Sequence, residues 1–134
     1  MFEKKLVISV AVIFVLTMAG GFLIHGWALH SDYTRLGTLM RSEEAAHKLF
    51  GFMFLADFVF ACGFSWIYIR GKEAKPWLGQ GVRYGIAVSL LTVIPMYLIY
   101  YVVMPFPSDL VAQQVVFETI EKVILGMVVA AINS

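Results

Sequence analysis

The chain has 134 residues, of which 60% are hydrophobic and 14% are charged, and its formal net charge is +1. Soluble domains carry about a quarter charged residues, so this composition excludes an ordinary soluble domain and predicts an integral membrane protein. The small net charge gives no basic face, which argues against nucleic-acid binding. The single cysteine, Cys62, excludes an intramolecular disulfide and any CxxC motif.

Four apolar runs are long enough to cross a bilayer, because a helix rising about 1.5 Å per residue needs roughly 20 apolar residues to do so. They cover residues 6–29, 49–69, 82–104 and 110–132. We therefore predict an all-α, polytopic membrane protein, with residues 1–134 forming a single four-transmembrane-helix bundle. The first run is too long for a signal peptide core, so we expect a retained helix. The short connections leave no room for a soluble catalytic domain.

The connection after the first run has helical signals of its own. In LGTLM, residues 36–40, the apolar residues follow helical spacing and predict a short interfacial turn of helix. Ser42 precedes two glutamates, which predicts a helix start with the serine as N-cap. In the third run Pro95 predicts an interruption, and in the last connection Ser108 is expected to cap the fourth helix.

Basic residues indicate the orientation of the bundle. They gather in the N-terminal tail and the second connection, at Lys4, Lys5, Arg70, Lys72, Lys75 and Arg83, against three in the first connection. By the positive-inside rule both termini are cytoplasmic. We expect a multi-pass protein of the cell inner (plasma) membrane.

The fourth run contains a polar stripe where a membrane span should be apolar. Gln114, Glu118, Glu121 and Lys122 recur at helical spacing and share one face. Asp57 of the second run falls at a similar depth. A charge at the bilayer centre costs about 2.5–3.5 kcal/mol on the insertion scale, so these groups should be paired or neutralised.

The charges in this polar cluster do not balance. Glu118 and Lys122 form a favourable i, i+4 pair. One lysine cannot neutralise three carboxylates, so the remaining acids are either protonated or balanced by a cation, a water-filled cavity or another chain. A purely structural alternative pairs Asp57 with Lys122 and keeps the glutamates protonated and hydrogen-bonded.

A second group of candidate residues lies in the first and third runs, toward the ends that we expect to face away from the cytoplasm. His25, Tyr97 and Tyr100 are candidate ligand or redox residues for haem or quinone. His25 and His30 are five residues apart and so do not share a helix face, and we predict neither a cofactor nor a metal site. Close helix contact is predicted at six glycines, Gly20, Gly21, Gly51, Gly63, Gly85 and Gly126.

The segment IYIRGKEAKPWLGQGVRYG, followed by a proline-containing span and VVFETIEKVILGMVVAA, resembles small four-helix bacterial inner-membrane proteins of unknown function. The resemblance implies a multi-pass bundle and no particular activity. No nucleophile has a base partner at useful spacing, so we expect no enzyme.

Three functional hypotheses follow from these patterns. The first is a non-catalytic membrane protein that acts by association, as an accessory subunit of a membrane complex or as a homo-oligomer, because a partner can cover the polar stripe. Its expected partners are lipids and other membrane chains or further copies. The second is a small proton or cation transporter or channel that uses Asp57, Glu118 and Glu121, tuned by Lys122. The third is a redox subunit that binds haem or quinone.

Overall fold

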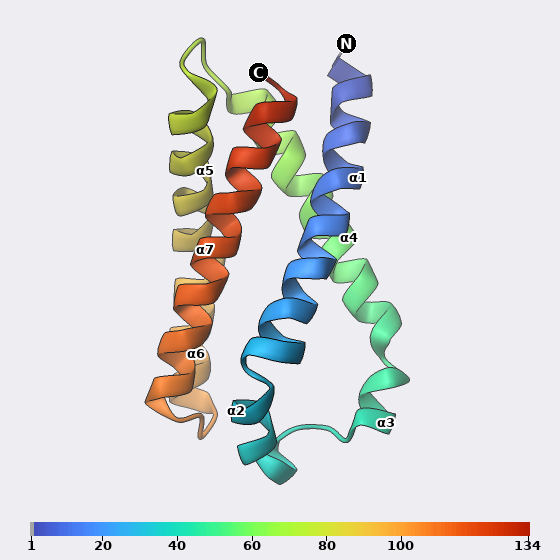
Figure 1. Cartoon of the computed structure of the whole chain (residues 1–134), viewed down its shortest axis with the longest axis vertical. Coiled ribbons are helices and arrows are strands. Elements are labelled where there is room, and N and C mark those ends of the chain that lie inside the picture. Colours follow the sequence, from blue (N-terminus) through green and yellow to red (C-terminus); the bar gives the residue numbers. More distant parts are fainter. Residues whose placement is uncertain (1) are drawn as a thin grey trace.

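The structure is a computed structural model and describes residues 2–134. Every regular element in that range is helical, which confirms the all-α prediction. The elements in chain order are α1 (Phe2–Gly21), the π-helix η1 (Phe22–Ala28), α2 (His30–Arg35), the 3-10 helix η2 (Gly37–Leu39), α3 (Glu43–His47), α4 (Phe50–Gly71), α5 (Trp77–Thr92), α6 (Ile94–Val103) and α7 (Ser108–Ile132). The long helices run side by side (Figure 1).

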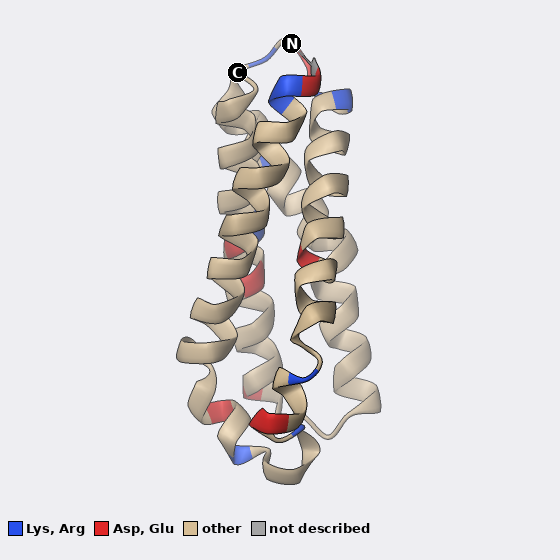
Figure 2. Cartoon of the chain, turned by 90° about the vertical axis from the view of Figure 1, so that its right-hand side faces the viewer, with Lys and Arg blue, Asp and Glu red and all other residues tan. Residues whose placement is uncertain are grey.

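The elongated molecule has two distinct ends. The two chain termini and the α4–α5 connection lie at one of them, here called the terminal end (Figure 1). The other, here called the loop end, holds α2, α3 and the α6–α7 turn. Acidic and basic residues gather at both ends, and a smaller group of them lies about midway between (Figure 2).

The helices have the length and polarity of a membrane protein. Within residues 2–134, three segments are long and apolar enough to cross a membrane: Glu3–Ala28, Phe50–Gly71 and Trp77–Val103. Large apolar side chains lie open on their surfaces, among them Val102 at 84% and Leu91 at 79% exposure. So much exposed apolar surface is unusual in water and is expected against lipid. The helix α7 is of similar length, with 25 residues, and it carries Glu118, Glu121 and Lys122 at its middle.

Local signals explain most helix ends. The third predicted run is broken at Val93 into α5 and α6, which confirms the interruption predicted at Pro95, because proline has no N–H for the helix ladder. The Ser42 hydroxyl accepts a hydrogen bond from the Ala45 N–H at 3.2 Å, which confirms that N-cap. The prediction for Ser108 was wrong: Pro107 occupies the N-cap position, so the serine lies within the first helical turn and caps nothing.

Glycines fix how closely α5 and α7 approach. A Cβ on Gly85 would lie 2.4 Å from the Lys122 carbonyl oxygen, and one on Gly126 would lie 2.2 Å from the Gly81 carbonyl oxygen. These positions admit no side chain, so the backbones touch and the register of α7 is set. A Cβ on Gly20 would lie 2.7 Å from Glu121 Oε2, so this glycine contacts the end of a side chain and not the α7 backbone. The prediction was wrong for Gly21, Gly51 and Gly63, whose Cβ positions meet nothing within 4 Å.

An apolar cluster joins α1, α4 and α7 in the half of the bundle nearer the terminal end. It consists of Ile13, Ala61, Phe64, Tyr68, Leu125, Val129 and Ala130. On α7 this cluster begins directly after the charged stripe. The charged groups therefore lie between this apolar cluster, on the side of the terminal end, and the loop end.

Candidate functional site

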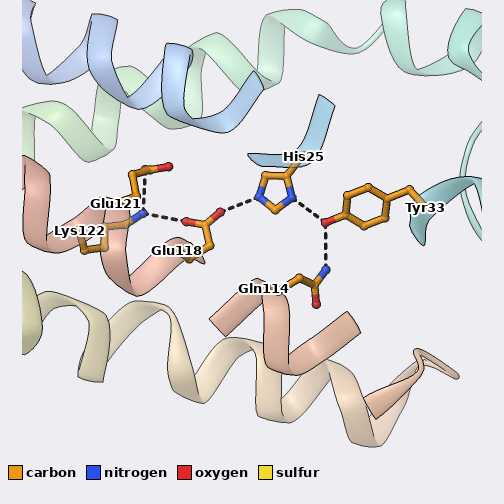
Figure 3. Close-up of polar contacts among 6 residues, drawn as sticks. All are labelled: His25, Tyr33, Gln114, Glu118, Glu121 and Lys122. Atoms are coloured by element: carbon orange, nitrogen blue, oxygen red, sulfur yellow. Dashed lines mark hydrogen bonds and ion pairs between the residues drawn. The ribbon is translucent and has the colours of Figure 1, made fainter. Parts of the chain in front are cut away.

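The π-helix η1 brings His25 to the polar stripe. The Leu29 N–H donates to the Ile24 carbonyl at 2.8 Å, one residue further back than in an α-helix. Such π segments are rare in proteins as a whole, and those that occur often lie at functional sites. From this wider turn the imidazole of His25 points toward α7 (Figure 3). The side chain is 32% exposed.

Both ring nitrogens of His25 are engaged. Its Nε2 lies 2.6 Å from Glu118 Oε1 on α7, and its Nδ1 lies 2.6 Å from the Tyr33 hydroxyl on α2 (Figure 3). Gln114 Nε2, one helical turn before Glu118, donates to the same hydroxyl at 3.0 Å. Three separate elements therefore meet at one imidazole.

Lys122 extends the chain of contacts toward the middle of the bundle. Its Nζ donates to Glu118 Oε2 at 2.9 Å and to Glu121 Oε1 at 3.1 Å, and it lies 5.2 Å from the centre of the Phe60 ring. The Lys122 side chain is only 8% exposed, that of Glu121 10% and that of Glu118 14%. The continuous set Gln114, Tyr33, His25, Glu118, Lys122 and Glu121 is here called the relay network (Figure 3).

The directions of these hydrogen bonds follow from the chemistry of the partners. With a neutral imidazole, the Nε2–H donates to the Glu118 carboxylate and the Tyr33 O–H donates to Nδ1, while the Tyr33 oxygen accepts from Gln114. With a cationic imidazole, Nδ1–H donates to the Tyr33 oxygen instead. Tyr33 can therefore form a hydrogen bond with His25 Nδ1 in both charge states of the imidazole.

The charge balance differs from the one expected from the sequence alone. Two carboxylates and Lys122 leave one negative charge in the relay network, and protonation of His25 or of one carboxylate makes it neutral. From the sequence we predicted His25 only as a candidate ligand or redox residue, and we did not predict Tyr33 as a site residue. Both belong to the polar cluster.

Asp57 lies near the network without joining it. It shares a cavity with Glu118, Glu121 and Lys122, as its predicted depth implied. Among the residues described it forms no ion pair and accepts no hydrogen bond, so the alternative pairing with Lys122 is not formed. Two further polar atoms of this cavity lack hydrogen-bond partners although they are buried, Thr17 Oγ1 and Glu121 Oε2.

Two cavities flank His25. The loop-end cavity, about 620 Å³, is lined by His25, Tyr33, Gln114, Tyr97 and Tyr100 together with residues of the loops. The second, here called the α1–α4 cavity, is about 610 Å³ and is lined by η1, α4 and the charged stripe of α7. His25 is thus the side chain common to both.

The two tyrosines predicted with His25 are brought near it without bonding to it. The Tyr97 ring is buried, Tyr100 is 40% exposed, and the two rings are 6.2 Å apart in a T-shaped arrangement. Because both nitrogens of His25 already have partners within the chain, a haem iron would have to displace Tyr33 or Glu118.

Comparison of the chain with protein-family models, with curated proteins and with solved structures found no match. The resemblance to small four-helix bacterial inner-membrane proteins stays a prediction. Function is therefore argued from the site itself.

Proposed function

We propose that this chain is a four-span membrane protein that handles protons or cations at its intramembrane carboxylates. In this proposal α7 is the fourth span, both termini are cytoplasmic and the loop end faces the opposite side of the membrane. The greater number of basic residues at the terminal end supports this orientation. The relay network is the observation that carries the proposal.

A proton can pass along the network by rearrangement of its existing hydrogen bonds. A hydronium ion in the loop-end cavity gives a proton to the Tyr33 oxygen and leaves water, while the Tyr33 O–H proton moves to His25 Nδ1 and forms the imidazolium. The Nε2 proton of His25 then moves to Glu118. Lys122 donates hydrogen bonds to both Glu118 and Glu121 and so connects the two carboxylates. Burial raises the pKa of Tyr33 above its usual value, so the phenol remains a neutral donor.

Glu121 is the carboxylate best placed to hold the proton. Its Oε1 accepts from Lys122, whereas its Oε2 is buried without a donor, so an added proton there relieves an unpaired charge. Glu118 instead accepts from both His25 and Lys122. The pathway then meets the apolar cluster around Leu125 and Val129. This supports a carrier that opens to one side at a time, rather than an open channel.

Infrared difference spectroscopy of the protein in lipid nanodiscs tests proton binding. Between neutral and acid pH we expect a carboxylic-acid C=O band that Glu121→Gln removes and Glu118→Gln shifts. The matched control is Glu44→Gln, an exposed loop acid, which should leave the band unchanged. A wild-type spectrum without any pH-dependent band from Glu121 would remove the proposal.

Transport is measured separately, in vesicles that contain a trapped pH-sensitive dye. An acid pulse outside should acidify vesicles with the wild-type protein faster than protein-free vesicles. The double variant Glu118→Gln, Glu121→Gln should return the rate to the protein-free value. Equal rates for the wild type and this double variant would contradict transport through these residues.

The association hypothesis rested on a polar stripe in need of a partner. Within this chain the stripe is already covered, because His25 and Phe60 contact its charged groups. Association therefore loses one of its motives, while the short connections and the small size of the bundle still favour it, and it stays a prediction. A single monomeric species, free of other chains after mild purification and native mass spectrometry, would count against it.

A further inference from the structure

The α1–α4 cavity has the size and the lining of a small-molecule site. The helices α1 and α4 cross near their middles and diverge toward the loop end (Figure 1). Residues of both helices line the cavity. Its volume of about 610 Å³ falls within the usual range for ligand pockets. Most of its wall is apolar, and Phe22, Phe50, Met53, Phe60 and Met96 contribute to it. Phe22 and Met53 are about half exposed, at 48% and 46%.

The polar part of the same wall is rich in acceptors and negatively charged. It holds the carboxylates of Asp57, Glu118 and Glu121 against the single ammonium of Lys122, with His25 at the rim. Lys122 already donates to both glutamates and faces the Phe60 ring. The cavity therefore offers hydrogen-bond acceptors and negative charge, and no free cationic donor of its own.

Three acceptors on residues that line this wall have no donor within the described chain, and two of them are buried behind its surface. Asp57 accepts no hydrogen bond, and the buried atoms Glu121 Oε2 and Thr17 Oγ1 have no partner. The Glu121 side chain is nine-tenths buried, so its unpaired oxygen is not simply solvated. Unpaired acceptors at such depth are costly, and a ligand that supplies positive charge would offset that cost.

The lining of the cavity also indicates which class of cation fits it. A hard inorganic ion needs six or more oxygen ligands or retained waters, and the phenylalanine and methionine walls supply none. An organic cation needs few ligands, because its charge is spread and its apolar groups gain from the same walls. An anion would meet like charge, and a neutral lipid tail would leave the acceptors unpaired.

We infer that the α1–α4 cavity binds an amphiphilic organic cation, with its charged group between Asp57 and Glu121 and its apolar body against Phe22, Phe50 and Met53. This inference rests on the proposed function and names the substrate class of the same carboxylates. The cation and protons neutralise the same negative charges, so each displaces the other. The groups that face this charge are His25 from η1, Asp57 from α4, and Glu118, Glu121 and Lys122 from α7; the lining residue from α6, Met96, is uncharged.

Binding of tetraphenylphosphonium to the protein in nanodiscs tests the inference. Titration calorimetry at two pH values should show weaker binding at the lower pH, and a pH dye in weak buffer should show proton release on binding. Asp57→Asn and Glu121→Gln should each weaken binding about tenfold. The control Glu73→Gln, an exposed acid of the α4–α5 connection paired with Lys75, should leave the affinity unchanged. Triphenylphosphine oxide, a neutral analogue, should bind far more weakly.

A second variant tests the volume of the cavity separately from the charge of its carboxylates. Ala56→Phe fills part of the cavity without altering any charged group, so it should abolish phosphonium binding and leave the pH-dependent infrared band of Glu121 intact. Unchanged affinity in Asp57→Asn, or equal binding of the neutral analogue, would overturn the inference. If the infrared band is present while the wild type binds no phosphonium, the inference fails and proton handling stands. Loss of the band in the wild type would overturn both.

Discussion

Replacing Lys122 by methionine tests the buried charge balance most severely. Lys122 is 8% exposed and donates to Glu118 and Glu121, so the substitution leaves two carboxylates facing each other without their shared cation. Removing one partner of a buried ion pair costs about 3–5 kcal/mol. We expect the free energy of unfolding to fall by about that amount at neutral pH. The loss should shrink as the pH falls, because a proton then replaces the missing positive charge.

Steric trapping in bicelles measures this loss as a reversible equilibrium. The double variant Lys122→Met, Glu121→Gln removes the carboxylate that was orphaned, so it should be more stable than Lys122→Met alone. The matched control is Lys75→Met in the exposed α4–α5 connection, where the lysine pairs with Glu73, and it should change stability little. If Lys122→Met proves no more harmful than Lys75→Met, the lysine is not a buried counter-ion and the reasoning is refuted.

Three further substitutions test separate contacts. Gly85→Ala should destabilise the protein by about 1–3 kcal/mol in the same assay, since its Cβ would lie 2.4 Å from a backbone carbonyl oxygen of α7, whereas Gly63→Ala, with open space around it, should not. Gly20→Ala would place a Cβ 2.7 Å from Glu121 Oε2, the end of a flexible side chain, so it should shift the infrared band of that carboxyl more than it alters stability. Tyr33→Phe should slow proton uptake from the loop end and cost about 1–3 kcal/mol, because two hydrogen-bond partners lose the hydroxyl; unchanged uptake would contradict its role.

Helical periodicity predicted the long helices and the polar stripe. The spacing of Gln114, Glu118 and Lys122 depends only on the regular turn of an α-helix, and α7 has that geometry throughout. The i, i+4 pairing of Glu118 with Lys122 followed from the same rule and is confirmed at 2.9 Å. The depth argument also brought Asp57 into the cavity beside them.

The sequence did not reveal how His25 and Tyr33 join that stripe. A π-helix follows no simple sequence rule, and it changes the direction of His25 relative to an α-helical turn. Tyr33 lies eight residues further on, in a loop helix whose position depends on tertiary contacts such as that of Arg35 with Asp109. The position of both His25 and Glu118 in the half of their helices nearer the loop end is a signal that could have suggested the pair, and we did not use it.

The central claim is that His25 and Glu118 are hydrogen-bonded partners inside the bilayer. Solid-state NMR of the protein in lipid bilayers, with the imidazole nitrogens and glutamate carboxyl carbons labelled, measures that contact directly. The separation of 2.6 Å between His25 Nε2 and Glu118 Oε1 predicts strong dipolar coupling between the Nε2 and the Glu118 carboxyl carbon, which Glu118→Gln removes. An Nε2 that shows no coupling to the Glu118 carboxyl carbon would contradict the account.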